Sequence, residues 1–424
     1  MSRKLLASMA VVAMLLLSAC ILAVGDQSKF APTIPVMSIE TDKGTSIESK
    51  EIYVRCTIDV SNTDGEHDLE SVDGKIRGRG NSTWDVPSYW YMPKKPYRVS
   101  FDQPVDLFGN GSATDWTLIA NYTDQSLTRN AAAYAVGRAV EAPYTTTAQC
   151  VDLYLNGVFQ GLYLVCEQVE IGENRVDIEK DYTVLDTGYL IEMDVNAYTE
   201  KEAGRDYFIM SDDAFGERAY KIRDTGKQWT QDNFDFIERV FGDAWAALHS
   251  GIWTDAASHI DMDSFARTYI VNELFNTQDV TDASFFMYRP AGGTIHSGPI
   301  WDFDNSSGNA TNLKSKDPGY MWAAETNPWY AALLEYPEFR TLVGSLLAEK
   351  QDAIRDAIDS ETGYALSHPQ DYKKNFEKWP VRGALVGSNP LEFLVIDEWS
   401  GHVHYLRDWL YASLDSMTEV YCSS

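Results

Sequence analysis

Acidic residues set among apolar ones are the part of this sequence best suited to chemistry. Asp279 stands at the end of an apolar segment, and Asp302 and Asp304 stand inside the phrase IWDFD. An unpaired buried charge is costly, so such acids must be solvated at a turn, hydrogen-bonded, or engaged with a cation. The last possibility makes residues 271–309 the leading candidate for a functional site.

A group of basic residues could supply charge complementary to an anionic ligand. Glycines between two of the arginines permit tight turns or close backbone approach, and guanidinium groups suit phosphate oxygens. The same spacing is also typical of a solvated edge strand, so these residues alone leave phosphate binding and a solvated face equally open. The basic residues are Lys75, Arg77, Arg79, Lys94, Lys95 and Arg98.

The next candidates lie at a predicted junction between a strand and a helix, in residues 116–138. Asp124 or Ser126 could cap this helix. Free N–H groups at a helix start favour anions, so Asn121 and Arg129 could face a phosphate. A packed helix with Arg129 on its solvated side is an equally good interpretation.

The elements around these residues change in character along the chain. Alternating apolar and polar positions predict strands from Val36 onward, and residues 151–169 are typical of a hairpin turning at Asn156-Gly157. Glu167 ends the second strand of that hairpin. It could position a lysine, but the pattern favours a simple strand end. Further strands are expected at residues 188–195 and 219–224, separated by a polar insertion.

From Trp229 the apolar spacing becomes helical, with Asp263 as a plausible cap. Two short strands, around 285–288 and 293–296, interrupt this part. Helices are then expected near 328–335, 337–358 and 391–417. The sequence therefore predicts an α+β fold with a β-rich part at residues 37–225 and a mainly helical part at 226–424, which contains the candidate segment 271–309.

Overall charge limits the classes of partner. The 424 residues include 63 Asp and Glu against 35 Lys and Arg, for a formal net charge of -28. Such a surface argues against binding of nucleic acid or of an anionic membrane. An anionic ligand such as a nucleotide would need local basic residues and divalent cations to overcome this field.

The N-terminus is typical of a targeting segment. Basic residues precede an apolar run that ends in Leu-Ser-Ala-Cys, which resembles the lipobox of bacterial lipoproteins and would make Cys20 the lipidated residue. Since apolar residues continue to Val24, an uncleaved membrane anchor or an ordinary signal peptide are the alternatives. Residues 1–25 are thus predicted to direct export, and residues 26–36 form a linker. Membrane association is expected only through this segment.

Four cysteines remain beyond Cys20, at positions 56, 150, 166 and 422. An exported location would permit disulfides, and sequence cannot separate the three full pairings. Free thiols or a single bridge are the better interpretation.

Several long phrases, in order, resemble the spore coat protein H (CotH) kinase family: RGRGNSTW, KKPYRVSF, WTLIANYTDQSLTRN, LYLNGVFQGLYLVCEQV and GPIWDFDNSSGN. The resemblance covers roughly residues 74–411. It implies an atypical protein-kinase-like bilobal fold, with a β-rich N-lobe, a helical C-lobe, and ATP with Mg or Mn between them. It also implies a catalytic role for Asp279 and a metal-binding role for Asp302.

Phosphoryl transfer gives each of the other candidates a role. Asp304 would be a second metal ligand or its neighbour. Arg79, Lys94, Lys95, Arg98 and Asn121 would contact ATP, and Glu167 would position a lysine. Asn276 and Asn309 are possible helpers. The expected partners are a nucleotide and a protein with a Ser or Thr acceptor.

The leading function is therefore an extracytoplasmic kinase that phosphorylates a surface or coat protein. ATP is scarce outside a cell, so a non-catalytic adhesin or coat component that keeps the fold is the alternative. The tryptophan and tyrosine content of an exported acidic protein also suggests a glycoside hydrolase with Asp279 and Asp302 as its acid and base. The family phrases disfavour that third interpretation.

Overall fold

The computed structural model describes residues 31–81, 83–84 and 92–422. The chain divides into two compact units, Met1–Thr33 and Ile34–Ser424, and all elements named below belong to the second. The predicted targeting segment 1–25, with Cys20, lies outside the described residues, as does the first part of the linker. Among the described residues, no helix has the length and apolar character needed to cross a membrane.

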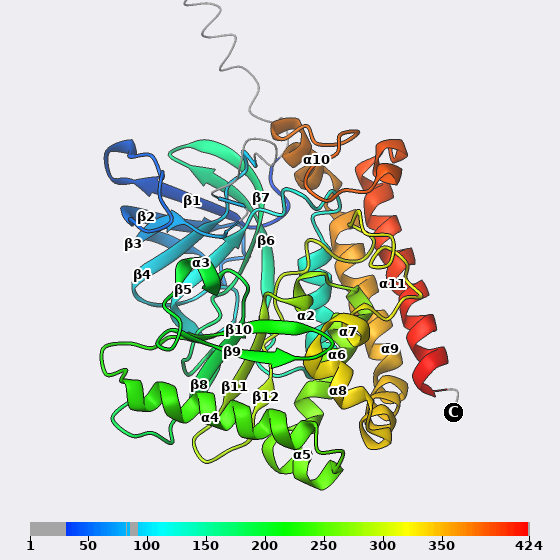
Figure 1. The fold of residues 1–424 in the computed structure, drawn as a ribbon. Coiled ribbons are helices and arrows are strands. Elements are labelled where there is room, and N and C mark those ends of the chain that lie inside the picture. The colour runs from blue at the N-terminus through cyan, green and yellow to red at the C-terminus, as the bar shows by residue number, and fades with distance from the viewer. Residues whose placement is uncertain (1–30, 82, 85–91, 423–424) are drawn as a thin grey trace, which may run out of the picture. The chain divides into compact units, whose positions relative to one another are not determined.

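Strands of the N-terminal half close into a barrel (Figure 1), in the order β1-β2-β3-β4-β5-β7-β6. Neighbouring strands run antiparallel, except that β1 and β6 close the barrel in parallel. The strands are β1 (Val36–Thr41), β2 (Val54–Ser61), β3 (Leu69–Gly78), β4 (Tyr97–Asp106), β5 (Ser112–Ile119), β6 (Ala148–Leu155) and β7 (Val158–Glu167).

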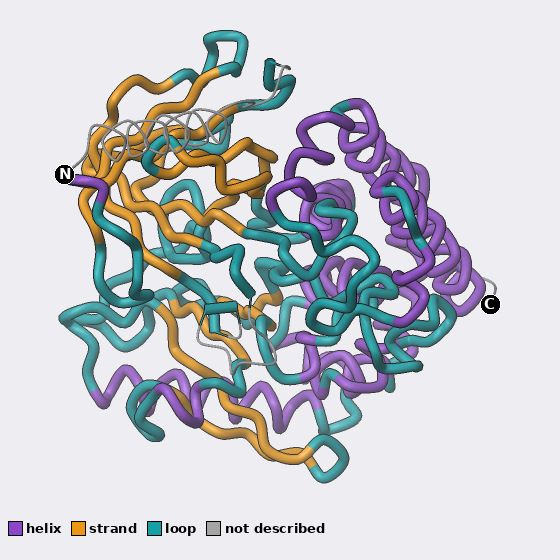
Figure 2. Tube along the Cα trace, turned by 90° about the horizontal axis from the view of Figure 1, so that it is seen from above, coloured by secondary structure: helices purple, strands orange, loops and turns teal. Residues whose placement is uncertain are grey.

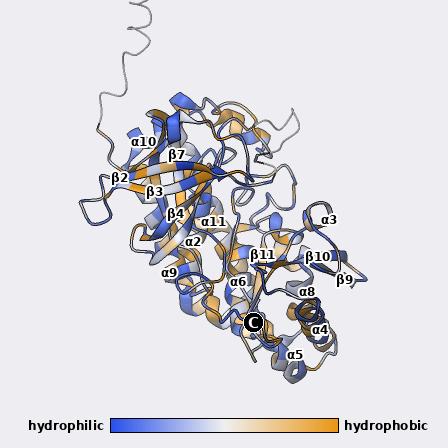
Figure 3. Ribbon diagram, turned by 90° about the vertical axis from the view of Figure 1, so that its left-hand side faces the viewer, coloured by the Kyte–Doolittle hydropathy of each residue, from blue (hydrophilic) through white to orange (hydrophobic). Residues whose placement is uncertain are grey.

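Period-two alternation explains this barrel, because successive side chains of a strand point to opposite faces. Cys56, Ile58 and Val60 of β2 are buried, while the residues between them are only half-buried. Hydrophilic and hydrophobic colours both run along these strands in Figure 3. The predicted hairpin is confirmed: β6 and β7 are joined at Asn156 and Gly157, with φ of 49° and 70°, as a tight two-residue turn requires.

A second sheet has the order β12-β11-β8-β10-β9. It draws β11 from after residue 226 and pairs it with β8 from before it, so this sheet joins the two predicted regions of the chain. The polar insertion, for which no strand was predicted, contains β9, which pairs with β10. The strands are β8 (Tyr189–Met193), β9 (Tyr207–Asp212), β10 (Gly216–Arg223), β11 (Phe285–Arg289) and β12 (His296–Ser297).

Helices dominate the C-terminal part: most of them lie to one side of the strands, and another runs along the lower edge of the molecule (Figure 2). Long helices α9 and α11 pack against each other, and α2 packs against α9. The helices are α2 (Arg129–Ala139), α3 (Ala197–Glu200), α4 (Gln231–Leu248), α5 (Trp253–His259), α6 (Met262–Phe275), α7 (Trp322–Thr326), α8 (Pro328–Leu334), α9 (Pro337–Ser367), α10 (Pro369–Lys378) and α11 (Trp399–Cys422), with 3₁₀ turns η1 (Asp42–Gly44), η3 (Asp279–Thr281) and η4 (Leu391–Val395). The mixed α+β composition, β-rich first and then mainly helical, is thus confirmed.

Helix starts and breaks differ from expectation in places. Asp261, not Asp263, caps α6, since its carboxylate accepts the N–H of Ser264. The predicted helix 391–417 is two elements, η4 and α11, and α10 was not predicted. Helix α2 begins at Arg129 rather than directly after Asp124 or Ser126, but the predicted capping role of Asp124 holds in part, since its carboxylate accepts the N–H of Arg129 at 2.9 Å.

The described cysteines are all free thiols, so none of the possible disulfide pairings is present among them. Cys56, Cys150 and Cys166 are buried, and Cys422 is exposed. Of the two preferred interpretations, free thiols or a single bridge, the structure agrees with the first.

Candidate functional site

A pocket of about 1220 Å³ lies between the barrel and the second sheet. Its walls come from β3 and β4 with the residues between them, the end of β5 and the turn after it, and strands β8 and β10. Segments 279–286 and 301–305 complete it. All three predicted acids line this pocket.

The helix–turn sequence after α6 brings Asp279 to the pocket. Helix α6 ends at Asn276, which takes the left-handed conformation with φ of 45°. Asparagine tolerates that conformation better than most residues, and it is a common helix terminator. The chain then reverses, and η3 places Asp279 at the pocket wall.

Asp302 and Asp304 lie on the loop after β12, hereafter the acidic loop (residues 302–309). Direct hydrogen bonds join this loop to the end of α6. The backbone N–H of Ser307 donates to the carbonyl of Phe275 at 2.7 Å, and the Thr277 hydroxyl donates to the carbonyl of Asp302 at 3.1 Å. The two acid-bearing segments are therefore held side by side.

Asp302 itself has a left-handed backbone, with φ of 66°. Such a conformation in a non-glycine residue costs on the order of 1–3 kcal/mol and is concentrated at functional sites. The next peptide is fixed from the side, because the N–H of Phe303 donates to Oδ1 of Asn130 at 2.8 Å. The surrounding contacts thus maintain a backbone that Asp302 would not adopt on its own.

The three carboxyl groups are half-buried and close enough to affect one another. Burial, followed by the charges of Asp304 and Asp282, raises the pKa of Asp279 to about 7. Burial and the charge of Asp279 raise the pKa of Asp302 to about 7. Burial, with the charge of Asp302, raises the pKa of Asp304 to about 8. A nearby cation would favour their ionised forms.

These acids fit a hard divalent cation. Among the described residues, no group of three His, Cys, Asp or Glu side chains is arranged to hold a metal alone. Magnesium is usually held by one or two carboxylates together with phosphate oxygens and water, which is what Asp302 and Asp304 could provide.

Among the predicted phosphate contacts, Arg79 is the best suited to bind a phosphate group. Its guanidinium lies over the Trp301 ring, 5.5 Å from the centroid, and it lines the pocket. Burial lowers its pKa, while the charge of Asp302 acts in the opposite direction. Its guanidinium makes no hydrogen bond to the described residues, so its donors are available to a ligand.

Lys94 and Arg98 also line the pocket, but their charged groups are already engaged. The ammonium of Lys94 donates to the Leu162 carbonyl at 2.5 Å and to Oδ1 of Asn375 at 2.8 Å, and burial lowers its pKa to about 7. Arg98 forms ion pairs with two acids, at 2.8 Å to Asp115 and 3.3 Å to Glu170. Both are less suited than Arg79 to a phosphate.

Lys95 and Glu167 lie outside the pocket lining. Lys95 donates to the backbone carbonyl of Trp84 at 2.9 Å. Glu167 lies beside the smaller cavity, where its carboxylate is 3.3 Å from the guanidinium of Arg175. Its ion-pair partner is thus an arginine, not the lysine that the kinase resemblance implies.

Asn121 lines the pocket, as the phosphate prediction requires, whereas Arg129 does not. The amide oxygen of Asn121 accepts from Asn130 at 3.0 Å, and its buried NH₂ group has no acceptor among the described residues. A buried donor without a partner is costly, so an anionic ligand that accepts a hydrogen bond from this NH₂ group would remove that cost. Arg129 is fully buried and pairs with Asp124.

The sequence interpretation missed the wall formed by β8 and β10. There Lys221 pairs with Asp194 at 2.9 Å, and Arg223 pairs with Glu192 at 2.6 Å. The two bases are two positions apart in the sequence, and so are the two acids. Because side chains of a strand alternate between faces, all four lie on one face of the sheet. That spacing, acids in YLIEMDV and bases in YKIRD, was the available signal, but only the pairing of the strands shows that they face each other.

The pocket is less acidic than the chain that surrounds it. Of its described lining residues, eight are basic and six acidic, against a clear excess of acids in the whole sequence. It is therefore a local cationic region. The basic ones are Lys50, Arg77, Arg79, Lys94, Arg98, Lys201, Lys221 and Arg223, and the acidic ones are Glu51, Glu192, Asp194, Asp279, Asp302 and Asp304.

A pocket with paired acids, an available arginine and a cationic lining is typical of a protein that handles phosphate groups. Comparison with known families supports the same interpretation. Residues 76–417 match the family described as CotH kinase protein, and the chain belongs to that family of atypical protein kinases. No curated protein matches the chain. Kinase membership implies that the protein uses ATP and acts on a protein substrate.

Proposed function

We propose that this protein is an extracytoplasmic kinase that transfers the γ-phosphoryl group of ATP to Ser or Thr of a surface or coat protein, with Mg or Mn. The observation that carries the proposal is the placement of Asp279, Asp302 and Asp304 with Arg79 in one cationic pocket. Family membership supports the kinase part. Export rests on the targeting sequence around Cys20, and a kinase-like arrangement of lobes rests on the family.

Each residue has a distinct role in this mechanism. Asp279 orients the acceptor hydroxyl and takes its proton as the oxygen bonds to the γ-phosphorus and ADP leaves. A pKa of about 7 suits a base that works near neutral pH. Arg79 binds phosphate oxygens. Asp302 and Asp304 would hold the metal ion, which when bound neutralises phosphate charge.

Calorimetric titration of ATP into the full chain, with and without Mg or Mn, tests the proposal. Metal-dependent binding followed by transfer of labelled phosphate to the protein itself or to a generic acceptor is the expected result. Absence of nucleotide binding under all these conditions would instead favour the non-catalytic adhesin or coat component.

Location is tested separately. The exported lipoprotein predicts incorporation of labelled fatty acid at Cys20 and its loss in Cys20→Ser. A wild-type chain that is exported but carries no lipid would favour the membrane anchor or a cleaved signal peptide.

A further inference from the structure

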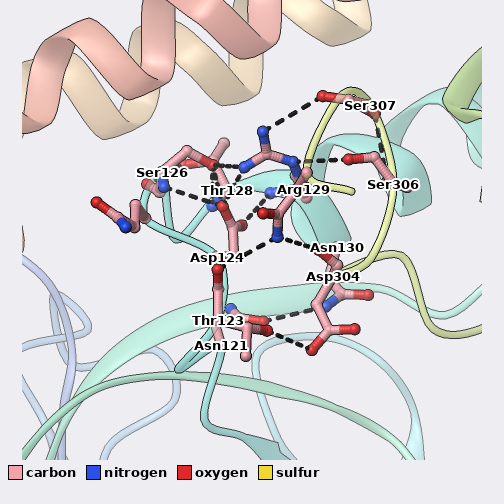
Figure 4. A network of polar contacts seen from close by, with 12 residues as sticks. Asn121, Thr123, Asp124, Ser126, Thr128, Arg129, Asn130, Asp304, Ser306 and Ser307 are labelled. Carbon is pink, nitrogen blue, oxygen red and sulfur yellow. Dashed lines mark hydrogen bonds and ion pairs between the residues drawn. The ribbon is translucent and has the colours of Figure 1, made fainter. Parts of the chain in front are cut away.

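Several side chains join the turn between β5 and α2, and the start of α2, to the acidic loop (Figure 4). Asn309 donates from its amide to the carbonyl of Asp304 at 2.6 Å and to the carbonyl of Thr123 at 3.2 Å. Asn389 donates to the same Thr123 carbonyl at 2.7 Å. The backbone of Thr123 is therefore fixed relative to the backbone of Asp304.

Arg129 holds the next part of the loop. Its guanidinium donates to the carbonyls of Ser306, at 3.0 Å, and Ser307, at 3.3 Å, and it pairs with Asp124. Arg129 and Asp124 are both completely buried. A buried ion pair is weak evidence for stability, because desolvation offsets the attraction, but it can fix one arrangement of the chain. Here it fixes the loop against the start of α2.

Between these anchors, one side chain reaches an acid directly. The hydroxyl of Thr123, itself only 3% exposed, donates to Oδ2 of Asp304 at 3.1 Å. Figure 4 shows Thr123 and Asp304 pointing toward each other from separate segments. The carboxyl groups of Asp304 and Asp302 lie close enough for the charge of Asp302 to raise the pKa of Asp304. The hydrogen bond from Thr123 thus restrains the rotation of the Asp304 carboxyl group.

We propose that Thr123 is a positioning residue, whose hydroxyl holds one oxygen of Asp304 and so orients the carboxylate for a divalent cation shared with Asp302. Groups that hydrogen-bond a metal ligand fix its direction, and their loss typically costs about 10- to 100-fold in metal affinity or activity. This inference rests on the proposed metal-dependent function.

Two substitutions separate the hydroxyl from the shape of the side chain. Thr123→Val keeps the branched shape but removes the donor, and Thr123→Ser keeps the donor but removes a methyl group. If Thr123 only fills space, valine is the better replacement. If it positions Asp304, serine is the better one.

Titration of Mn²⁺ alone into the full-length protein, with free Mn²⁺ followed by electron paramagnetic resonance, measures this directly. We expect the Mn²⁺ Kd of Thr123→Val to rise about tenfold or more, with Thr123→Ser close to wild type. Thr362→Val is the matched control, because Thr362 is equally buried but donates to Ile358 within α9, away from the pocket. It should lower the Tm comparably and leave the Mn²⁺ Kd unchanged.

Three results would overturn the proposal. These are wild-type Mn²⁺ affinity in Thr123→Val, a loss in Thr123→Ser equal to that in Thr123→Val, and a wild-type protein that binds no Mn²⁺. ATP is titrated into the same samples. A wild-type protein that binds Mn²⁺ but no ATP would refute the kinase function while leaving the role of Thr123 intact.

Discussion

Asp279 and Asp302 line the same pocket, but the proposed mechanism gives them different roles. One substitution at each residue distinguishes these roles. Asp279→Asn removes the base without removing a metal ligand, so MgATP binding should persist while phosphoryl transfer falls about 10²- to 10⁴-fold. Asp302→Asn should instead abolish the dependence of nucleotide affinity on metal. Calorimetry together with a phosphotransfer assay measures both. Equal loss of binding in the two variants would contradict this division of roles.

Arg79 and Lys94 were predicted as equivalent phosphate contacts, but their surroundings distinguish them. The guanidinium of Arg79 is available, whereas Lys94 already donates to two acceptors. Arg79→Met should therefore weaken MgATP binding by about 10- to 100-fold, since a hydrogen bond to a charged group contributes about 1.5–3 kcal/mol. Lys94→Met should change affinity much less.

Lys95→Met is the control for that comparison, because Lys95 carries the same charge in the next position but lies outside the pocket lining. The order of affinities, with Arg79→Met the weakest, is the measured outcome. Reversal of Arg79 and Lys94 would show that Lys94 leaves its two acceptors to bind the nucleotide.

Helix α11 carries a buried histidine that links the stability of the protein to pH. His402 is fully buried, edge-on to the Phe393 ring. Burial, followed by the charge of Arg129, lowers its pKa from 6.5 to about 4. Between these values the unfolded chain binds a proton that the native protein does not. The stability that neutral His402 provides is thus fully present above pH 6.5 and is lost as the pH falls to about 4, by about 3 kcal/mol in total.

His402→Leu should remove this contribution, so that its Tm falls less than the wild-type Tm between pH 6.5 and 4. His404→Leu, on the exposed side of the same helix, is the control. Differential scanning calorimetry in steps of pH measures the three slopes. Parallel curves for wild type and His402→Leu would contradict the assignment, whatever the absolute Tm of the variant.

Elements with a strong local signal could be predicted, and those that depend on distant partners could not. The hairpin at Asn156-Gly157 follows from its turn residues and alternation, and α4 from its helical spacing. By contrast, β9 lies in a polar segment and becomes a strand through its pairing with β10. Helix α10 has little apolar content, and its buried face, including Tyr372 and Phe376, is defined by tertiary packing.

The same distinction applies to the candidate site. The acids could be found because IWDFD places charge where a core strand would have none. The role of Thr123 could not, since a threonine in a turn carries no local sign of a partner about 180 residues away. For Glu167, the predicted position at the end of a strand is confirmed. The lysine partner that the family resemblance implied is wrong, because its partner is Arg175.

The chain as a whole is strongly acidic, whereas its pocket is cationic. This contrast predicts an unusual dependence of the rate of nucleotide binding on salt concentration. A formal charge of -28 repels MgATP during its approach, and the Debye length of about 10 Å at 0.1 M salt means that added salt screens this long-range repulsion. Contacts made inside the pocket are screened much less. The association rate constant should therefore rise with ionic strength, unlike that of an enzyme that attracts its ligand from a distance.

Stopped-flow measurement with a fluorescent ATP analogue and Mg, between low and physiological KCl, tests this. A rate constant that falls with salt would mean that the field of the pocket dominates the approach, and that the acidity of the rest of the surface has no influence on nucleotide capture.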